Sequence, residues 1–150
     1  MYTIEQMINY EMEALQLKAV LNIAHRGAAG YCPENTMIAF KRSIELGATA
    51  IETDVQMTAD GHLVLIHDEL LKRTTGSPKL VKDVTLAELQ QLDAGSWFDP
   101  QFKSEVVPTL EQLLEFLQPL QVQLNQMAPK PNSLRKRPTG NKYHAISSPE

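Results

Sequence analysis

The chain has 150 residues, 43% of them hydrophobic, which is enough for one globular domain with a hydrophobic core. Its net charge of −4 provides no general positive field, so nucleic acid is excluded as the expected partner. The single cysteine, Cys32, excludes an internal disulfide framework and is compatible with a reducing compartment.

The N-terminal residues 3–20 place apolar side chains close to helical spacing, which predicts an amphipathic helix. This region lacks a basic start followed by an unbroken apolar stretch, so we expect no signal peptide. No apolar run in the sequence approaches the roughly 18 residues that a membrane span requires. The expected location is therefore the cytoplasm.

A short apolar strand is predicted over residues 20–24, with His25, Arg26 and Gly27 at its C-terminal end. Catalytic residues of α/β folds gather at that end of their strands. A loop follows, and Asn35 or Thr36 is the predicted N-cap of a helix that stops at Gly47.

Two further strands are predicted over residues 48–57 and 62–67, with a turn at Asp60-Gly61 between them. Their connection is short, so they form either a hairpin or a compact crossover. A hairpin would bring His67 opposite Glu52 or Asp54. The two-residue period of a strand puts these carboxylates on one face, where they repel one another and where a bound cation would stabilise them.

The second half of the chain contains two capping boxes, at residues 85–88 and 109–112, each of which predicts a helix start. A strand is predicted over residues 120–125. Residues 126–150 hold five basic groups, one acidic group and four of the nine prolines, which predicts a disordered or loop-like tail. Trp97 and Phe98 are expected to cover the rim of the site or the edge of the barrel. The order of elements is that of the opening of an α/β barrel, with about four of its eight strands.

The candidate chemistry lies in three short motifs. His25-Arg26 offers a proton-transfer group and a fork of donors suited to phosphate oxygens. Glu52 and Asp54 are candidate ligands of a hard cation. His67-Asp68 adds a second imidazole and a carboxylate that could orient it. Each motif alone also has a structural explanation, namely loop hydrogen bonds, an exposed strand face or a structural histidine.

Together the motifs are more specific. HRG and PENT, then GA-x2-IE-x-DV-x2-T-x-DG-x2-V-x2-HD, then RTTG, LDAGSWF and PTLEQLL closely resemble the glycerophosphodiester phosphodiesterase family. The resemblance implies a TIM-type (β/α) barrel of the phospholipase-C-like phosphodiesterase type. It implies acid–base catalysis by His25 and His67, binding of Mg²⁺ or Ca²⁺ by Glu52 and Asp54, and phosphate contact by Arg26. The implied reaction splits a small glycerophosphodiester into glycerol 3-phosphate and an alcohol.

The sequence departs from the family in two places. Gln123 stands where the family's third metal-binding Glu is expected, and Asn125 where its Lys is expected. The family's later strands have no counterpart after residue 125. We therefore expect a partial phosphodiesterase domain over residues 1–125, a barrel truncated to its first half, with an exposed edge through which the chain could self-associate.

Two alternatives to the hydrolase stay open at this point. One is a catalytically inactive fragment, or a phosphate-binding module, of the same family. The other is a related lipid phosphodiesterase acting on sphingomyelin-like or lysophospholipid headgroups.

Overall fold

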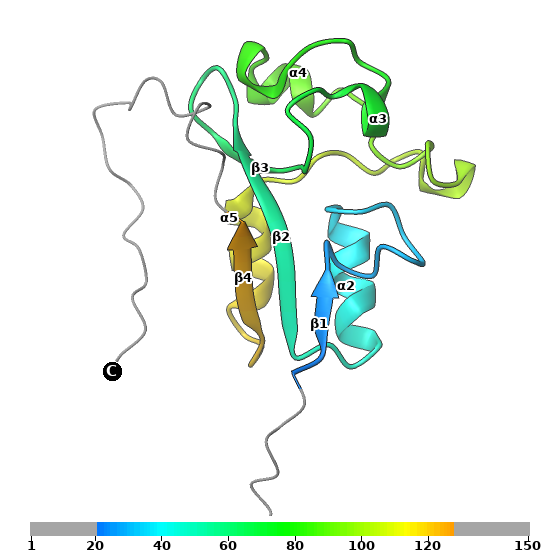
Figure 1. The fold of residues 1–150 in the computed structure, drawn as a ribbon, viewed down its shortest axis with the longest axis vertical. Helices are drawn as coiled ribbons and strands as arrows, with labels where there is room; N and C mark the ends of the chain where they lie inside the picture. The colour runs from blue at the N-terminus through cyan, green and yellow to red at the C-terminus, as the bar shows by residue number, and fades with distance from the viewer. Residues whose placement is uncertain (1–20, 128–150) are drawn as a thin grey trace, which may run out of the picture.

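A computed structural model describes residues 21–127 of the chain, and Figure 1 shows the arrangement of its elements. These elements are, in chain order, β1 (Ile23–His25), α2 (Met37–Glu45), β2 (Ala50–Met57), β3 (Leu63–Leu65), α3 (Lys72–Thr75), η1 (Val81–Asp83), α4 (Leu86–Leu89), η2 (Pro100–Phe102), α5 (Leu110–Leu117) and β4 (Gln123–Met127). The predicted helix over residues 3–20 and nearly all of the predicted tail lie outside the described residues.

The long strand β2 is the centre of the sheet. β1 pairs in parallel with its first three residues and β4 with its first five, and β3 pairs with its last three residues in antiparallel. All three parallel strands therefore point the same way, and their C-terminal ends lie at one edge (Figure 1). No helix within the described range is long and apolar enough to cross a membrane.

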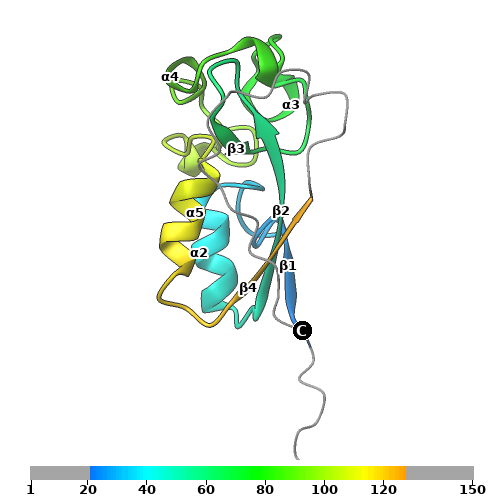
Figure 2. The same cartoon turned by 90° about the vertical axis from the view of Figure 1, so that its left-hand side faces the viewer.

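Helices α2 and α5 cover one face of the sheet (Figure 2). Between them and the sheet lies the larger hydrophobic core. Its fully or nearly fully buried members come from both helices and from β2 and β3: Phe40, Ile51, Val55, Leu65, Leu110, Leu113 and Leu117. This packing fixes the orientation of β2, because Ile51 and Val55 must face the helices, and residues of the opposite parity, Glu52 and Asp54, then face away from them.

A second core lies under the segment between β3 and α5. It consists of eight buried apolar residues from β3, η1, α4 and the loops around them: Val64, Ile66, Leu71, Val81, Val84, Leu89, Ala94 and Val107. This packing holds residues 66–107 as an ordered cap above the sheet, although most of them are in loops and short helices (Figure 1).

The predicted helix starts are confirmed. Thr36 is the N-cap of α2, and Thr85 and Thr109 form the capping boxes of α4 and α5. α4 is shorter than the apolar pattern indicates and ends at Leu89, after which the chain continues in three-residue turns. The last strand runs over Gln123–Met127 rather than residues 120–125.

The hairpin is the correct alternative for the connection between β2 and β3. Val55 pairs with Leu65, and Ile66 N–H donates to the Asp54 carbonyl at 3.0 Å. The expectation that His67 lies directly opposite Glu52 or Asp54 is wrong, because the hairpin register places Ile66 opposite Asp54. His67 instead follows the last paired residue, and its carbonyl accepts from Gln56 Nε2.

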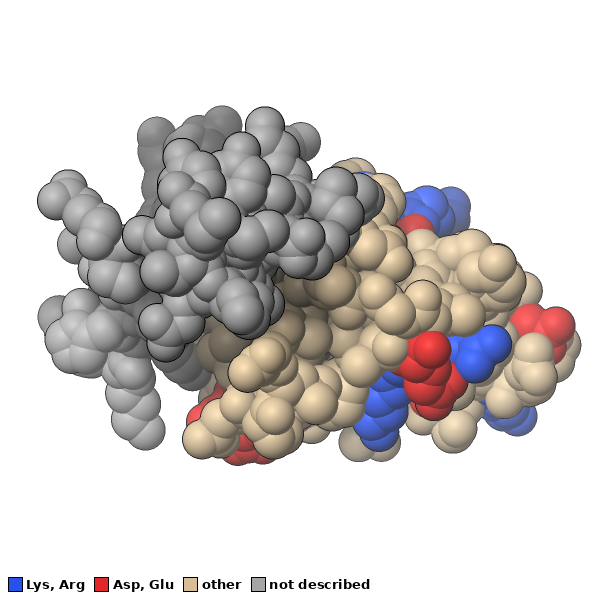
Figure 3. Space-filling view, turned by 90° about the horizontal axis from the view of Figure 1, so that it is seen from below, with Lys and Arg blue, Asp and Glu red and all other residues tan. Residues whose placement is uncertain are grey.

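At the opposite end of the molecule, where the parallel strands begin, the described surface is largely uncharged (Figure 3). Its Lys and Arg side chains lie next to Asp and Glu side chains. The charged groups that could do chemistry are at the other end of the sheet.

Candidate active site

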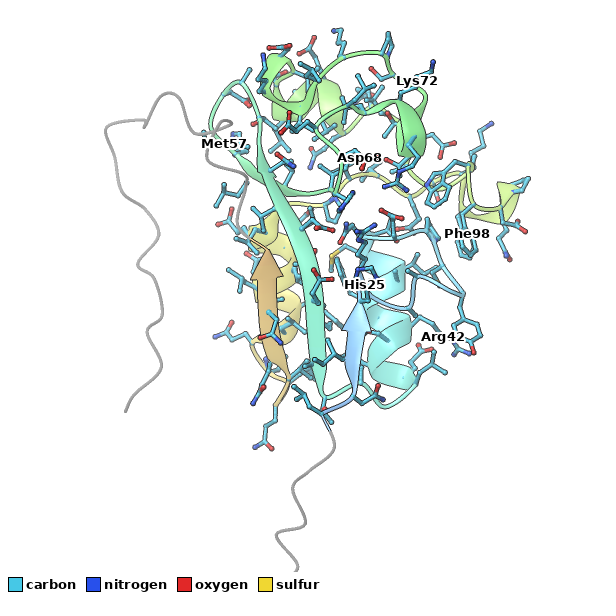
Figure 4. The ribbon with its side chains drawn as sticks, in the orientation of Figure 1. His25, Arg42, Met57, Asp68, Lys72 and Phe98 are labelled. Atoms are coloured by element: carbon cyan, nitrogen blue, oxygen red, sulfur yellow. The ribbon has the colours of Figure 1, made fainter. Side chains whose placement is uncertain are left out.

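The candidate site lies where β1 and β2 approach their C-terminal ends. His25 is the last residue of β1 and pairs with Glu52 of β2, and Asp54 lies two residues further along the same face. His67 and Asp68 come from the segment after β3 (Figure 4). The sheet and the hairpin therefore bring together the three motifs that the sequence singled out.

A tight turn after β1 aims Arg26 into this region. Arg26 has φ 55° and Gly27 has φ 77°, both in the left-handed region. The turn is held at both ends, since Arg26 N–H donates to the Glu52 carbonyl at 2.8 Å and the Arg26 carbonyl accepts from Asn35 N–H at 3.0 Å. Gly27 is required because a Cβ there would lie 2.7 Å from the carbonyl carbon of Ala39 in α2. A non-glycine residue held in the left-handed region stores strain of the kind that gathers at functional sites.

Glu52 and Asp54 are mostly buried, with side-chain exposures of 18% and 13%. Asp54 is paired: its Oδ2 accepts from Asn35 Nδ2 at 3.1 Å and lies 3.0 Å from Arg26 Nε. The Arg26 contact is an ion pair without hydrogen-bond alignment, because that Nε–H has no hydrogen-bond partner. Glu52 Oε2 is buried without any hydrogen-bond partner, and His25 Nε2 is 3.7 Å away.

Asn35 organises this half of the site, and the sequence pointed to it only as a possible helix cap. It is buried, has φ 55°, donates to Asp54, and accepts at Oδ1 from Thr53 Oγ1 at 2.8 Å. Asn tolerates the left-handed region better than other side chains do, which explains the residue type. The sequence signal that could have identified Asn35 as a site residue was its place in the PENT motif.

The other half of the site centres on Arg73, which sequence reasoning did not single out as a site residue. Its Nη1 and Nη2 donate to the two oxygens of Glu34 at 2.9 and 2.7 Å, and its Nε donates to Asp68 Oδ2 at 2.6 Å. Asp68 Oδ1 lies 2.6 Å from His67 Nδ1, and Glu34 Oε1 accepts from Arg26 Nη1 at 3.1 Å. Trp97, expected at the rim, lies with its ring 5.9 Å from the Arg73 guanidinium carbon.

The electrostatics of this network follow from these contacts. Hydrogen bonding by Arg73 lowers the pKa of Asp68, and burial only partly opposes it. For Glu34, burial opposes ionisation, but the hydrogen bonds and charges of Arg73 and Arg26 outweigh it and lower the pKa. Hydrogen bonding to Glu34 is the largest reason why the pKa of Arg73 is raised. All three groups are therefore charged at neutral pH.

The described residues fit a divalent cation only in part. The unpartnered, buried Glu52 Oε2 is the kind of oxygen that a hard cation satisfies, and Asp54 adds a second carboxylate. No group of three or more His, Cys, Asp or Glu residues within 21–127 could hold a metal ion. The register places Asn125 beside Glu52 and Met127 beside Asp54. Gln123 is level with Ala50, two residues before Glu52.

Comparison with known proteins shows which family this chain resembles. The model of the glycerophosphoryl diester phosphodiesterase family matches residues 25–146. A glycerophosphodiester phosphodiesterase of Caldanaerobacter subterraneus is 55% identical over 97 residues, which are 65% of this chain and 40% of that protein. One of Bacillus subtilis is 47% identical over 104 residues, with 64% of this chain and 36% of that protein covered.

Solved structures give the same result. A glycerophosphodiester phosphodiesterase of Agrobacterium tumefaciens superposes with a TM-score of 0.68 at 42% identity, covering 71% of this chain and 46% of that one. A phosphodiesterase of Oleispira antarctica, in complex with the product sn-glycerol-3-phosphate, gives 0.69 at 39% identity and covers 71% and 43%. The described part corresponds to the first half of a TIM-type barrel, and the chain spans less than half the length of these relatives.

Proposed function

Since the chain belongs to the glycerophosphoryl diester phosphodiesterase family, we propose that its site hydrolyses glycerophosphodiesters to glycerol 3-phosphate and an alcohol. The observation that supports this most is the convergence of His25, His67 and Arg26 with the paired carboxylates at one edge of the sheet. The substrate is a small phosphodiester.

Arg26 is the group that binds the phosphate. Two of its nitrogens already contact Asp54 and Glu34, which fix the guanidinium plane and leave Nη2 for a phosphoryl oxygen. The charge that develops on the phosphoryl oxygens in the transition state is offset by a positive group held in place before the reaction begins.

The two histidines transfer the protons. One imidazole takes the proton of the attacking oxygen as that oxygen bonds to phosphorus, and the other gives a proton to the alcohol oxygen as its bond to phosphorus breaks. Ionised Asp68 accepts at His67 Nδ1, so the Nε2 of His67 is the atom available for transfer. If a hydroxyl of the substrate attacks instead of water, a cyclic phosphate forms first, and phosphorus NMR would detect it.

Glu52 and Asp54 are the residues that would hold Mg²⁺ or Ca²⁺. When bound, such an ion acts as a Lewis acid on a phosphoryl oxygen.

The test is release of glycerol 3-phosphate from glycerophosphocholine by the purified chain in Mg²⁺ or Ca²⁺. We expect turnover that His25→Ala and His67→Ala both abolish while the cooperative unfolding transition is kept. Wild-type turnover no higher than that of His25→Ala would overturn the enzymatic proposal for this chain.

A second candidate, phosphate binding without turnover, is favoured by one observation. The positions of β4 level with Glu52 and Asp54 are Asn125 and Met127, so within 21–127 no third acid joins the carboxylates. Calorimetry with glycerol 3-phosphate separates the two functions: binding that Arg26→Gln removes, in a chain without turnover, would support this one. No feature of the described site favours sphingomyelin-like or lysophospholipid headgroups. The cytoplasmic location of the chain stays a prediction.

A further inference from the structure

Arg73 joins two segments that are far apart in the sequence. Its Nη1 and Nη2 hold both oxygens of Glu34, which follows β1 and is 39 residues away. Its Nε holds Asp68, which follows β3. Each of the three donor atoms thus has a charged acceptor, and one guanidinium holds two carboxylates at once.

Each of these carboxylates in turn holds a residue of the site with its other contact. Asp68 Oδ1 faces His67 Nδ1 at 2.6 Å, and Glu34 Oε1 accepts from Arg26 Nη1 at 3.1 Å. An ionised carboxylate can only accept, so neutral His67 must carry its hydrogen on Nδ1. Its Nε2 then has the free lone pair.

From this geometry we propose that Arg73 is a positioning residue that sets the His67 tautomer and the direction of the Arg26 guanidinium together. It does not touch the reacting atoms. It acts through Asp68 on the proton-transfer group and through Glu34 on the phosphate-binding group. The catalytic consequence rests on the proposed function, whereas the structural consequence, a single tautomer of His67, does not.

The residue type matters because three contacts must be made at once. A planar guanidinium presents donors in a fixed fork, while a lysine ammonium is a compact point charge that cannot reach both carboxylates in the same way. Arg73→Lys therefore keeps the charge and removes the geometry. Arg73→Gln removes both.

The control is Arg42→Gln. Arg42 donates to Glu45 at 2.8 Å on the outer surface of α2, and its side chain is 45% exposed, close to the 42% of Arg73. Arg42→Gln and Arg73→Gln each remove an arginine from a partly exposed ion pair. Of the two arginines, only Arg73 contacts groups that reach the site.

The experiment measures nitrogen NMR spectra of the histidine rings in the full chain, together with kcat and KM for glycerophosphocholine and thermal unfolding. His67 is assigned by comparison with His67→Gln. We expect the wild-type protein to show the Nδ1–H tautomer of His67, and Arg73→Gln and Arg73→Lys to show a mixture of both tautomers. We expect kcat to fall about 10- to 100-fold in Arg73→Gln, the usual effect of removing an outer partner of a catalytic group. KM should change less than kcat, and Arg42→Gln should match the wild type.

The proposal fails if wild-type His67 carries its hydrogen on Nε2, or if a folded Arg73→Gln protein keeps both the single tautomer and the wild-type kcat. If Arg73→Gln does not fold, Arg73→Lys is judged by the same two criteria. A chain without turnover would contradict the proposed function but not the inference, because the comparison of the His67 tautomer in the wild type with that in Arg73→Gln decides the structural part without any turnover.

Discussion

Asn35 connects the backbone of the first loop to the acidic face of β2. It lies in the left-handed region with φ 55°, donates to Asp54 and accepts from Thr53, whose side chain is fully buried. The left-handed backbone conformation costs about 1–2 kcal/mol for a residue with a Cβ. The two side-chain hydrogen bonds of Asn35 offset this cost.

We expect Asn35→Ala to lower the free energy of unfolding by about 2–4 kcal/mol, because it leaves Thr53 Oγ1 without its acceptor and keeps the backbone strain. Asn35→Gly is the matched variant, since it loses the same hydrogen bonds but relieves the strain, and should be less destabilised by about 1 kcal/mol. Urea denaturation measures both. Equal losses in the two variants would mean that the backbone is not strained.

The Arg73 network predicts how stability depends on pH. Arg73 lowers the pKa of Asp68, and for Glu34 its hydrogen bonds outweigh the opposing effect of burial, so both carboxyls have lower values in the folded protein than their ordinary 3.8 and 4.5. Their stabilisation is complete above the ordinary values and is lost as pH falls through the lowered ones. We expect urea midpoints to fall below about pH 5, and to fall less steeply in Arg73→Gln. The Arg42→Gln control should keep the wild-type slope.

At the scale of elements, α5 shows how one helix serves both the core and the surface. Leu113 is fully buried among the residues that pack on β2, whereas its neighbour Leu114 is 40% exposed. The helix thus fixes which face of the sheet is apolar, and with it the face that carries Glu52 and Asp54.

Leu113→Ala should destabilise the chain by about 2–5 kcal/mol, the usual cost of a cavity in a packed core. Leu114→Ala removes the same atoms from a partly exposed site and should cost less than about 1 kcal/mol. Denaturant titration of both variants checks this. A similar loss for both would mean that α5 does not pack on the sheet as described.

The register of β4 determines where a third acid would help to bind a cation. Asn125 and Met127 are level with Glu52 and Asp54, and Gln123 is level with Ala50. We expect Asn125→Glu to tighten Mg²⁺ or Ca²⁺ binding in calorimetry, because it adds a formal charge level with Glu52. Gln123→Glu adds the same charge further away and is the control. The assignment of Gln123 as third ligand would be supported only if that variant bound most tightly.

At the scale of the whole molecule, the described residues form four strands of a barrel-type sheet. β1 and β4 each pair with β2 on one side, and within 21–127 no strand pairs with their other sides. Beside β4 lies a groove of about 510 Å³ lined partly by Leu114, Val122 and Leu124.

Self-association through such an edge stays a prediction, which sedimentation velocity would test. We expect a second copy to cover the groove, because unpaired strand edges and exposed apolar side chains favour association. Leu114→Glu should then shift the protein toward the monomer at a given concentration, and Glu111→Gln, on the same groove, should not. A wild-type monomer at all concentrations would exclude this form of assembly.

The sequence alone determined the features that depend on near neighbours. Helix starts at Thr36, Thr85 and Thr109 follow from side chains that bond within three residues, and the Asp60-Gly61 turn from local backbone preference. The family and the barrel class followed from motifs, as did the expectation that His25, Glu52, Asp54 and His67 share one site. Their catalytic and metal-binding roles remain predictions.

Only the tertiary structure decided the contacts across long separations. Arg73 reaches Glu34 across 39 positions, Asn35 reaches Asp54 across 19, and the β4 register places Asn125, and not Gln123, level with Glu52. The reason is physical: local patterns fix which residues bury and which face they share, but a one-step shift between strands changes every neighbour. The register between strands is set by the packing of α2 and α5 on β2. That packing joins distant segments, so no short stretch of sequence specifies it.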